Sequence, residues 1–168
     1  MRLFVSIPMT HSMKQSLTEL QKEMVQKDFR GNFTRKENLH MTVAFIGEYE
    51  DSDAVLRAME RVPVPYVTLE LTKLGHFGQL YWAGTRENPK LEEYALALRN
   101  EFRKDGIPFD PHPFLAHITV ARRVIAPKDA AVTVPRGHME FRHVCLMVSE
   151  RGEDGNVFYR EIGRVTRK

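Results

Sequence analysis

Apolar residues recur every three or four positions in three segments of the chain, and this spacing predicts three amphipathic helices. In the first segment, the apolar face consists of Met13, Leu17, Leu20 and Met24. Asp51-Ser52 can cap the start of the second helix, and Asp105-Gly106 can end the third. The predicted helices span Ser12 to Lys27, Asp51 to Val62, and Pro89 to Lys104.

Shorter apolar or alternating runs predict β-strands. These runs are Arg2 to Ile7, Leu39 to Ile46, Val67 to Leu74, Gln79 to Gly84, Ala116 to Arg122, Phe141 to Ser149, and Val157 to Val165. The third and fourth runs form a predicted hairpin around Gly75–Gly78, and the last two form another around Gly152–Gly155. Gly31-Asn32 is expected to break the chain, and residues 126–137 are expected to be irregular. Helices and strands alternate irregularly, which favours an α+β fold with largely antiparallel sheets over a doubly wound parallel sheet.

Composition limits the class of protein. The chain has 168 residues, of which 42% are hydrophobic and 28% charged, and no segment resembles a linker, so residues 1–168 are expected to form a single domain. The net charge of +3 suits an anionic partner. The single cysteine, Cys145, lies in an apolar run and is expected to be a buried strand residue. No transmembrane segment or signal peptide is recognisable, so a cytoplasmic location without membrane association is expected.

A short motif occurs twice. Residues 40–44 read His-Met-Thr-Val-Ala, and residues 117–121 read His-Ile-Thr-Val-Ala, each at the start of a predicted strand. Side chains two positions apart share one face of a strand, so each copy presents an imidazole and a hydroxyl together. If a pseudo-two-fold axis relates the two copies, the two pairs converge on one cleft.

Two opposed histidines suit an in-line displacement at phosphorus. One imidazole accepts a proton from the attacking oxygen while the other donates a proton to the leaving oxygen, and an unperturbed pKa near 6.5 makes both protonation states accessible. The threonine hydroxyls can donate hydrogen bonds to the non-bridging phosphoryl oxygens, where negative charge develops. The sequence contains no cluster of carboxylates or cysteines for a metal, so neither a metal nor a cofactor is expected.

The duplicated motif and its surroundings resemble the two-histidine phosphoesterases, in particular the bacterial and archaeal RNA 2′,3′-cyclic phosphodiesterases, formerly called 2′-5′ RNA ligases. The segments that carry the resemblance are Met1 to Pro8, Glu37 to Glu48, and Ala116 to Arg122. The resemblance implies two similar lobes, each with an antiparallel sheet and flanking helices, around a central cleft. It also implies hydrolysis of a terminal 2′,3′-cyclic phosphate of RNA to a 2′-phosphate, with tRNA fragments as candidate substrates.

The resemblance assigns a role to each residue of the motif. His40 would donate the proton to the leaving 3′-oxygen, His117 would accept the proton of water, and Thr42 and Thr119 would bind the phosphoryl oxygens. Members of the family often have Arg-Pro just before the second motif, whereas this chain has Leu115-Ala116. Arg122 and Arg35 are the candidates to replace that charge. Arg122 is the fifth residue after His117 and would point away from the cleft on an ideal strand, so a β-bulge is required to turn it inward.

Other functions remain open at this stage. The same cleft could belong to an RNA-end binding module with little turnover, to an enzyme for another cyclic or 2′-5′ phosphodiester, or to a reversible 2′-5′ ligase of tRNA halves. Four aromatic residues are candidates for stacking on a base: Phe77, Tyr81, Trp82 and Phe114. A monomer is expected, since one cleft is sufficient for the chemistry.

Overall fold

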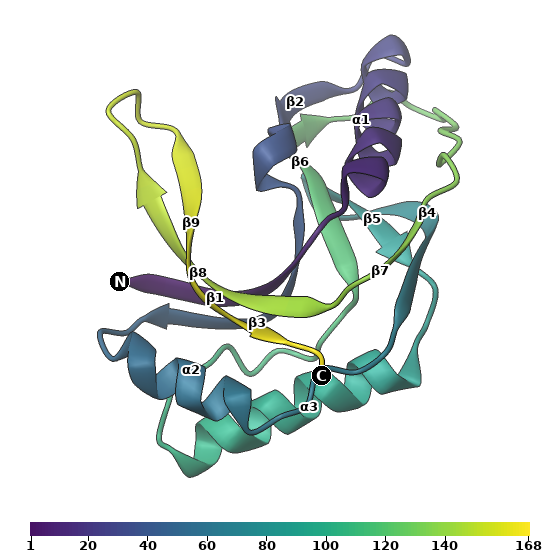
Figure 1. Ribbon diagram of the computed structural model, residues 1–168. Coiled ribbons are helices and arrows are strands. Elements are labelled where there is room, and N and C mark those ends of the chain that lie inside the picture. Colours follow the sequence, from purple (N-terminus) through teal and green to yellow (C-terminus); the bar gives the residue numbers. More distant parts are fainter.

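The strands of the computed structural model, which describes residues 1–168, form two antiparallel sheets (Figure 1). The first sheet has the order β3-β1-β8-β9, with bounds β1 Arg2–Pro8, β3 His40–Glu48, β8 His143–Arg151 and β9 Val157–Thr166. The second sheet has the order β2-β6-β5-β4-β7, with bounds β2 Arg30–Phe33, β4 Thr68–Phe77, β5 Leu80–Thr85, β6 His117–Ile125 and β7 His138–Glu140. The predicted α+β class with antiparallel sheets is therefore confirmed.

Three α-helices cover the sheets: α1 (His11–Gln26), α2 (Ser52–Glu60) and α3 (Pro89–Lys104). Helix α1 packs against β6 and β7 of the second sheet, whereas α2 and α3 pack on each other and on strands of the first sheet. Each helix begins after a residue whose side chain accepts a hydrogen bond from a backbone amide of the first turn: Thr10 for α1, Asp51 for α2 and Asn88 for α3. These caps satisfy amide groups that have no partner within the helix, which is why each helix starts where it does.

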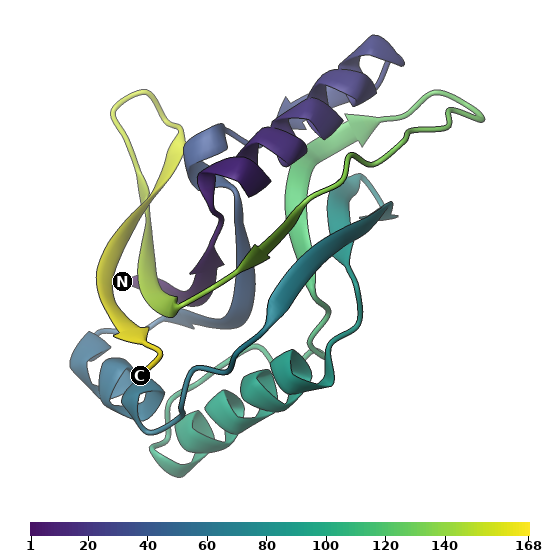
Figure 2. The same cartoon turned by 45° about the vertical axis from the view of Figure 1, so that its right-hand side comes forward.

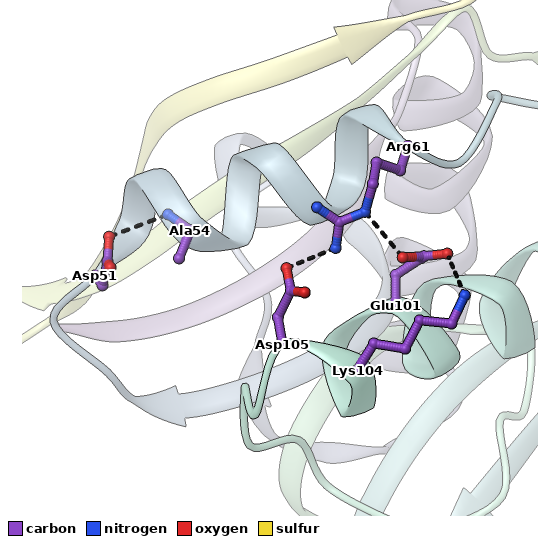
Figure 3. Close-up of polar contacts among 6 residues, drawn as sticks. All are labelled: Asp51, Ala54, Arg61, Glu101, Lys104 and Asp105. Atoms are coloured by element: carbon purple, nitrogen blue, oxygen red, sulfur yellow. Dashed lines mark hydrogen bonds and ion pairs between the residues drawn. The ribbon is translucent and has the colours of Figure 1, made fainter.

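An ionic network joins α2 to α3 (Figure 3). Arg61, which follows the last turn of α2, donates from Nε to Glu101 at 2.9 Å and from its terminal nitrogen to Asp105. Lys104 donates to the same Glu101 at 3.2 Å. These four alternating charges link the end of α2 to the end of α3.

Each lobe draws its elements from several separate parts of the sequence. Strand β1 belongs to the first sheet, α1 and β2 belong to the second lobe, and β3 returns to the first sheet. The segment between β6 and β7 runs beside α1 (Figure 2), where the Ser16 hydroxyl donates to the carbonyl of Arg136 and the backbone amide of Thr133 donates to Glu23. The two lobes are therefore interleaved along the chain.

The apolar face predicted for the first helix is buried. Met13, Leu17, Leu20 and Met24 are all fully inaccessible to solvent, and each such side chain contributes about 1.5–3 kcal/mol relative to exposure. The same cluster of buried residues continues into both sheets. None of the helices combines the length and apolar composition that a bilayer crossing requires.

The observed elements depart from the predicted ones in three places. Gly31-Asn32, expected to break the chain, lies within the edge strand β2, which pairs with β6. Strand β7 was not predicted at all. The hairpin turn is shorter than predicted, because β4 continues through Phe77 and only Gly78-Gln79 turn. Gly78 has a φ of 57°, which a glycine adopts without strain.

Candidate active site

Both His-x-Thr motifs line a single cleft of about 740 Å³ between the two sheets. His40 and Thr42 lie on β3 of the first sheet, and His117 and Thr119 lie on β6 of the second. Strands β3 and β6 approach each other closely, so the two motifs face one another across the cleft. Arg122 lines the same cleft. The structure thus brings together all five residues that the sequence singled out.

The alternation of side chains along β3 and β6 explains this placement. Met41 and Ile118, between the histidine and the threonine of each motif, are fully buried, while the histidines and threonines are only partly buried. Residues of one strand alternate between its two faces. The apolar residues therefore anchor each strand in the core and direct the polar pair into the cleft.

The two imidazoles are held in the same way. His40 Nδ1 lies 2.7 Å from the carbonyl oxygen of Asn38, and His117 Nδ1 lies 2.6 Å from the carbonyl oxygen of Leu115. A carbonyl can only accept, so Nδ1 must carry a proton in both rings. In the neutral ring, Nε2 is then the basic nitrogen. Each carbonyl belongs to the residue two positions before its histidine, so the backbone itself sets the tautomer.

The two histidines differ at Nε2. His40 Nε2 lies 2.9 Å from the hydroxyl of Thr42, which donates when the ring is neutral. His117 Nε2 makes no hydrogen bond within the protein. His117 can therefore accept a proton without first giving up a protein partner, whereas His40 and Thr42 form one hydrogen-bonded unit.

A β-bulge follows the threonine in both motifs. In the pairing of β3 with β1, Val5 opposes Ala44 and Ser6 opposes Thr42, which leaves Val43 as the extra residue. In the pairing of β6 with β5, an equivalent shift leaves Val120 unpaired. The Val-Ala part of the repeated motif therefore marks the bulge, with both of its residues buried in each copy.

The bulges restart the alternation of side chains and turn the next residue into the cleft. That residue is Phe45 in the first motif and Arg122 in the second, and both line the cleft. The bulge that the sequence required for Arg122 to reach the site is present. Arg35, the other candidate for the missing charge, lines the cleft as well, and its guanidinium lies 4.0 Å from Asp154.

The pKa of His40 is lowered from its ordinary value of 6.5. Burial is the main cause, because it disfavours the charged ring. The hydrogen bond to the Asn38 carbonyl opposes this effect, and the positive charges of Arg122 and His117 lower the pKa further. Arg122 and His117 line the same cleft as His40.

The four aromatic candidates separate into different environments. Tyr81 stacks on His76 and contacts Phe29 on the opposite face of the second sheet from the cleft. Phe114 packs against the hydrophobic core. Trp82 and Phe77 both contact the ring of His117, with centroids 6.1 Å and 5.9 Å from it.

Sequence reasoning missed the residues that flank His40. The rings of Phe4 and Tyr159 each have a centroid 5.1 Å from that of His40, and they also contact each other, so the three rings form one cluster. The side-chain amide of Asn38 donates to the carbonyl of Val157 at 3.1 Å, which connects the β8–β9 hairpin to the segment that holds His40. Nothing in the local pattern of the C-terminal hairpin indicates this proximity, since strand pairing over more than a hundred residues creates it.

Outside the cleft, Cys145 is buried as predicted, and its thiol donates to Glu161 at 3.2 Å. Burial raises the pKa of this thiol to about 12, so it is not a nucleophile near neutral pH. No three His, Cys, Asp or Glu side chains come together in an arrangement suited to a metal ion. Metal independence itself remains a prediction.

Comparison with known proteins identifies relatives of this chain. Residues 7–82 match the family described as LigT like phosphoesterase. The RNA 2′,3′-cyclic phosphodiesterase of Thermotoga maritima is 26% identical over 131 residues, which cover 73% of this chain and 70% of that protein. The enzyme of the same name from Escherichia coli K12 is 34% identical over 104 residues, covering 59% and 57%. That from Methanocaldococcus jannaschii is 24% identical over 179 aligned positions, covering 94% and 96%.

Solved structures show the same fold along almost the whole chain. E. coli LigT complexed with 3′-AMP superposes with a TM-score of 0.83 at 24% identity, covering 99% of this chain and 96% of that one. TT0787 of Thermus thermophilus superposes with a TM-score of 0.79 at 22% identity, covering 99% and 97%. Both lobes and the cleft between them therefore belong to one shared architecture.

Proposed function

We propose that this chain, of which residues 7–82 match the LigT-like phosphoesterase family, hydrolyses the terminal 2′,3′-cyclic phosphate of RNA to a 2′-phosphate, with His40 and His117 as the acid–base pair. The observation that carries the proposal is the duplicated arrangement in one cleft. Two imidazoles, each with Nδ1 bound to the carbonyl two residues before it, face a shared space together with two threonine hydroxyls and a guanidinium.

In the proposed reaction, His117 Nε2 accepts a proton from the attacking water. The water oxygen bonds to phosphorus as the bond from phosphorus to O3′ breaks, and His40 Nε2 donates a proton to O3′. The product carries a 2′-phosphate and a free 3′-hydroxyl. Thr42, Thr119 and Arg122 stabilise the negative charge on the non-bridging oxygens. The assignment of His40 as proton donor and His117 as proton acceptor follows the family resemblance.

The surroundings of His40 are consistent with a proton donor. A lowered pKa makes the imidazolium a stronger acid, and the anionic phosphate of a bound substrate favours its protonated form. When His40 is protonated, its Nε2 can donate to the hydroxyl of Thr42, so the proton lies on the nitrogen that faces the cleft.

The names of the relatives support RNA as the substrate, and 3′-AMP in the E. coli LigT structure supports a cleft that accepts a nucleotide with a phosphate at its 3′ end. We further propose that residues 1–168 fold as one domain and act as a cytoplasmic monomer. One chain supplies both histidines and both threonines, and each lobe depends on segments from across the sequence.

The decisive experiment uses an oligonucleotide that ends in a 2′,3′-cyclic phosphate, with EDTA present throughout. We expect complete conversion to an end with a 2′-phosphate, and a rate lower by about 10²–10⁴-fold in a His117→Ala variant. Binding without any product would favour an RNA-end binding module. Activity lost with EDTA and restored by a divalent metal would overturn the metal-free mechanism, and a 3′-phosphate product would overturn the assigned leaving group.

A further inference from the structure

Phe77 is an exposed aromatic ring that lies directly against one of the two histidines. Its side chain is 52% accessible, and its centroid lies 5.9 Å from that of His117 and 5.3 Å from that of Trp82. We propose that Phe77, supported by Trp82, is the surface on which the base of the terminal nucleotide stacks. This inference rests on the proposed function, since it concerns the nucleotide that carries the cyclic phosphate.

The strand register places Phe77 on the catalytic face of the second sheet. Phe77 pairs with Leu80 across the hairpin, and Trp82 pairs with Thr119 of β6. Residues that oppose each other in antiparallel strands share a face, and so do residues two apart on one strand. Leu80 and Thr119 both line the cleft. Phe77 and Trp82 therefore lie on the same face of the sheet as these cleft residues, next to His117.

Two glycines allow the indole of Trp82 to lie flat beneath this surface. A Cβ atom added at Gly75 would lie 2.2 Å from the ring, and one at Gly84 would lie 3.1 Å from it. The indole therefore occupies space that side chains would fill at most strand positions. Trp82 is only 7% accessible, so it acts as a fixed support while Phe77 presents the free ring. A ring held in place before binding loses little conformational freedom when a base stacks on it.

A nucleobase is the occupant that this surface fits best. The base is separated from the cyclic phosphate by one ribose ring, so a phosphate held at His117 places the base within reach of a ring that contacts His117. Stacking on an aromatic side chain tolerates every base, because each presents a π-face. The Phe77 ring contacts Trp82 and His117, and the half of its side chain that remains exposed is available to contact a base.

The other exposed aromatic rings do not compete for this role. The hydroxyl of Tyr66 donates to Glu140, away from the cleft. Phe158 is 42% accessible, but its ring contacts neither His40 nor His117, whereas its neighbour Tyr159 contacts His40. Tyr159 in turn is packed against both Phe4 and His40. Phe158 consequently provides a matched control, an exposed phenylalanine of similar accessibility whose ring contacts neither histidine.

The first test compares two substrates that differ only in the base: adenosine 2′,3′-cyclic phosphate and the cyclic phosphate of 1,4-anhydroribitol, which lacks a base. Phe77→Ala should lower kcat/KM for the adenosine substrate by about 5- to 150-fold, the range found when an aromatic partner of a base is removed. It should leave kcat/KM for the base-free substrate within about twofold. Phe77→Trp should retain activity, and Phe158→Ala should behave as the wild type with both substrates. Equal losses on the two substrates would overturn the proposal.

A binding measurement tests the same surface without turnover. Trp82 is the only tryptophan of the chain, so its fluorescence reports on a base that stacks beside it. Adenosine 2′-phosphate should quench this fluorescence, and 1,4-anhydroribitol 2-phosphate should not. Phe77→Ala should raise the Kd for adenosine 2′-phosphate by about 5- to 150-fold. If the wild-type protein binds but does not hydrolyse, only the proposed function fails; if neither the base nor Phe77 affects the Kd, the stacking surface fails.

Discussion

Substituting Gly75 by alanine tests how the aromatic rings beside His117 are positioned. Gly75 pairs with Trp82 across the β4–β5 hairpin, and the indole covers the position that a side chain would occupy. The backbone at Gly75 has no positive φ, so alanine itself introduces no backbone strain. The effect of Gly75→Ala therefore reports on the contact between the new methyl group and the ring.

The size of the clash sets the expected effect. The added Cβ would lie 2.2, 2.4 and 2.6 Å from three carbon atoms of Trp82, so the ring must move by about 1.2 Å to reach a contact of roughly 3.4 Å. Overpacking of this kind costs about 1–3 kcal/mol. For a chain of this length that corresponds to a fall in Tm of about 2–12 °C. Because the indole contacts His117, a displacement of about 1 Å should also lower kcat/KM by about 10- to 100-fold.

Thermal unfolding followed by circular dichroism and steady-state hydrolysis of a cyclic phosphate measure these two effects. Gly84→Ala is the matched control, because its Cβ would contact the same ring at 3.1 Å and requires a shift of only a few tenths of an ångström. We expect its Tm and kcat/KM to stay close to those of the wild type. If Gly75→Ala equals Gly84→Ala in both measurements, the indole is not seated on Gly75 and the reasoning is refuted.

Three further predictions concern the histidines. The positive charge of Arg122 lowers the pKa of His40, so Arg122→Gln should raise that pKa. If His40 must be protonated for activity, the alkaline limb of the pH profile of kcat/KM moves to higher pH. Movement of the acid limb would instead make His40 the base, and an unchanged pH profile would exclude His40 from the titrating pair. His40→Ala and His117→Ala should each lower kcat by about 10²–10⁴-fold. The loss of kcat in the double variant should be far smaller than the product of the two single losses, since the residues assist one displacement. Fully multiplicative losses would contradict a concerted pair. An ester with a good leaving group should restore the rate of His40→Ala but not of His117→Ala, because such a group needs no proton; the opposite result would exchange the two roles.

The sequence by itself determined the helices, most of the strands and the four residues of the duplicated motif. The reason is that these features are local: helical spacing buries one face of α1 (His11–Gln26), and alternation on a strand directs His40 and Thr42 to one side. A local pattern of this kind is the same whatever the strand later pairs with. The repetition of the motif then pointed to a shared cleft without any knowledge of the sheets.

The tertiary structure decided the features that depend on pairing between distant segments. Strand β2 exists because β6 offers its edge, although Gly31-Asn32 disfavours a strand locally. Whether Arg122 reaches the cleft depended on the bulge at Val120, which is defined only by the register of β6 against β5. The aromatic neighbours of the two histidines, such as Tyr159 and Trp82, come from strands whose order in the sheets the local pattern does not encode. Register and strand order are set by the packing of the whole chain, which is why only the folded structure shows what surrounds each imidazole.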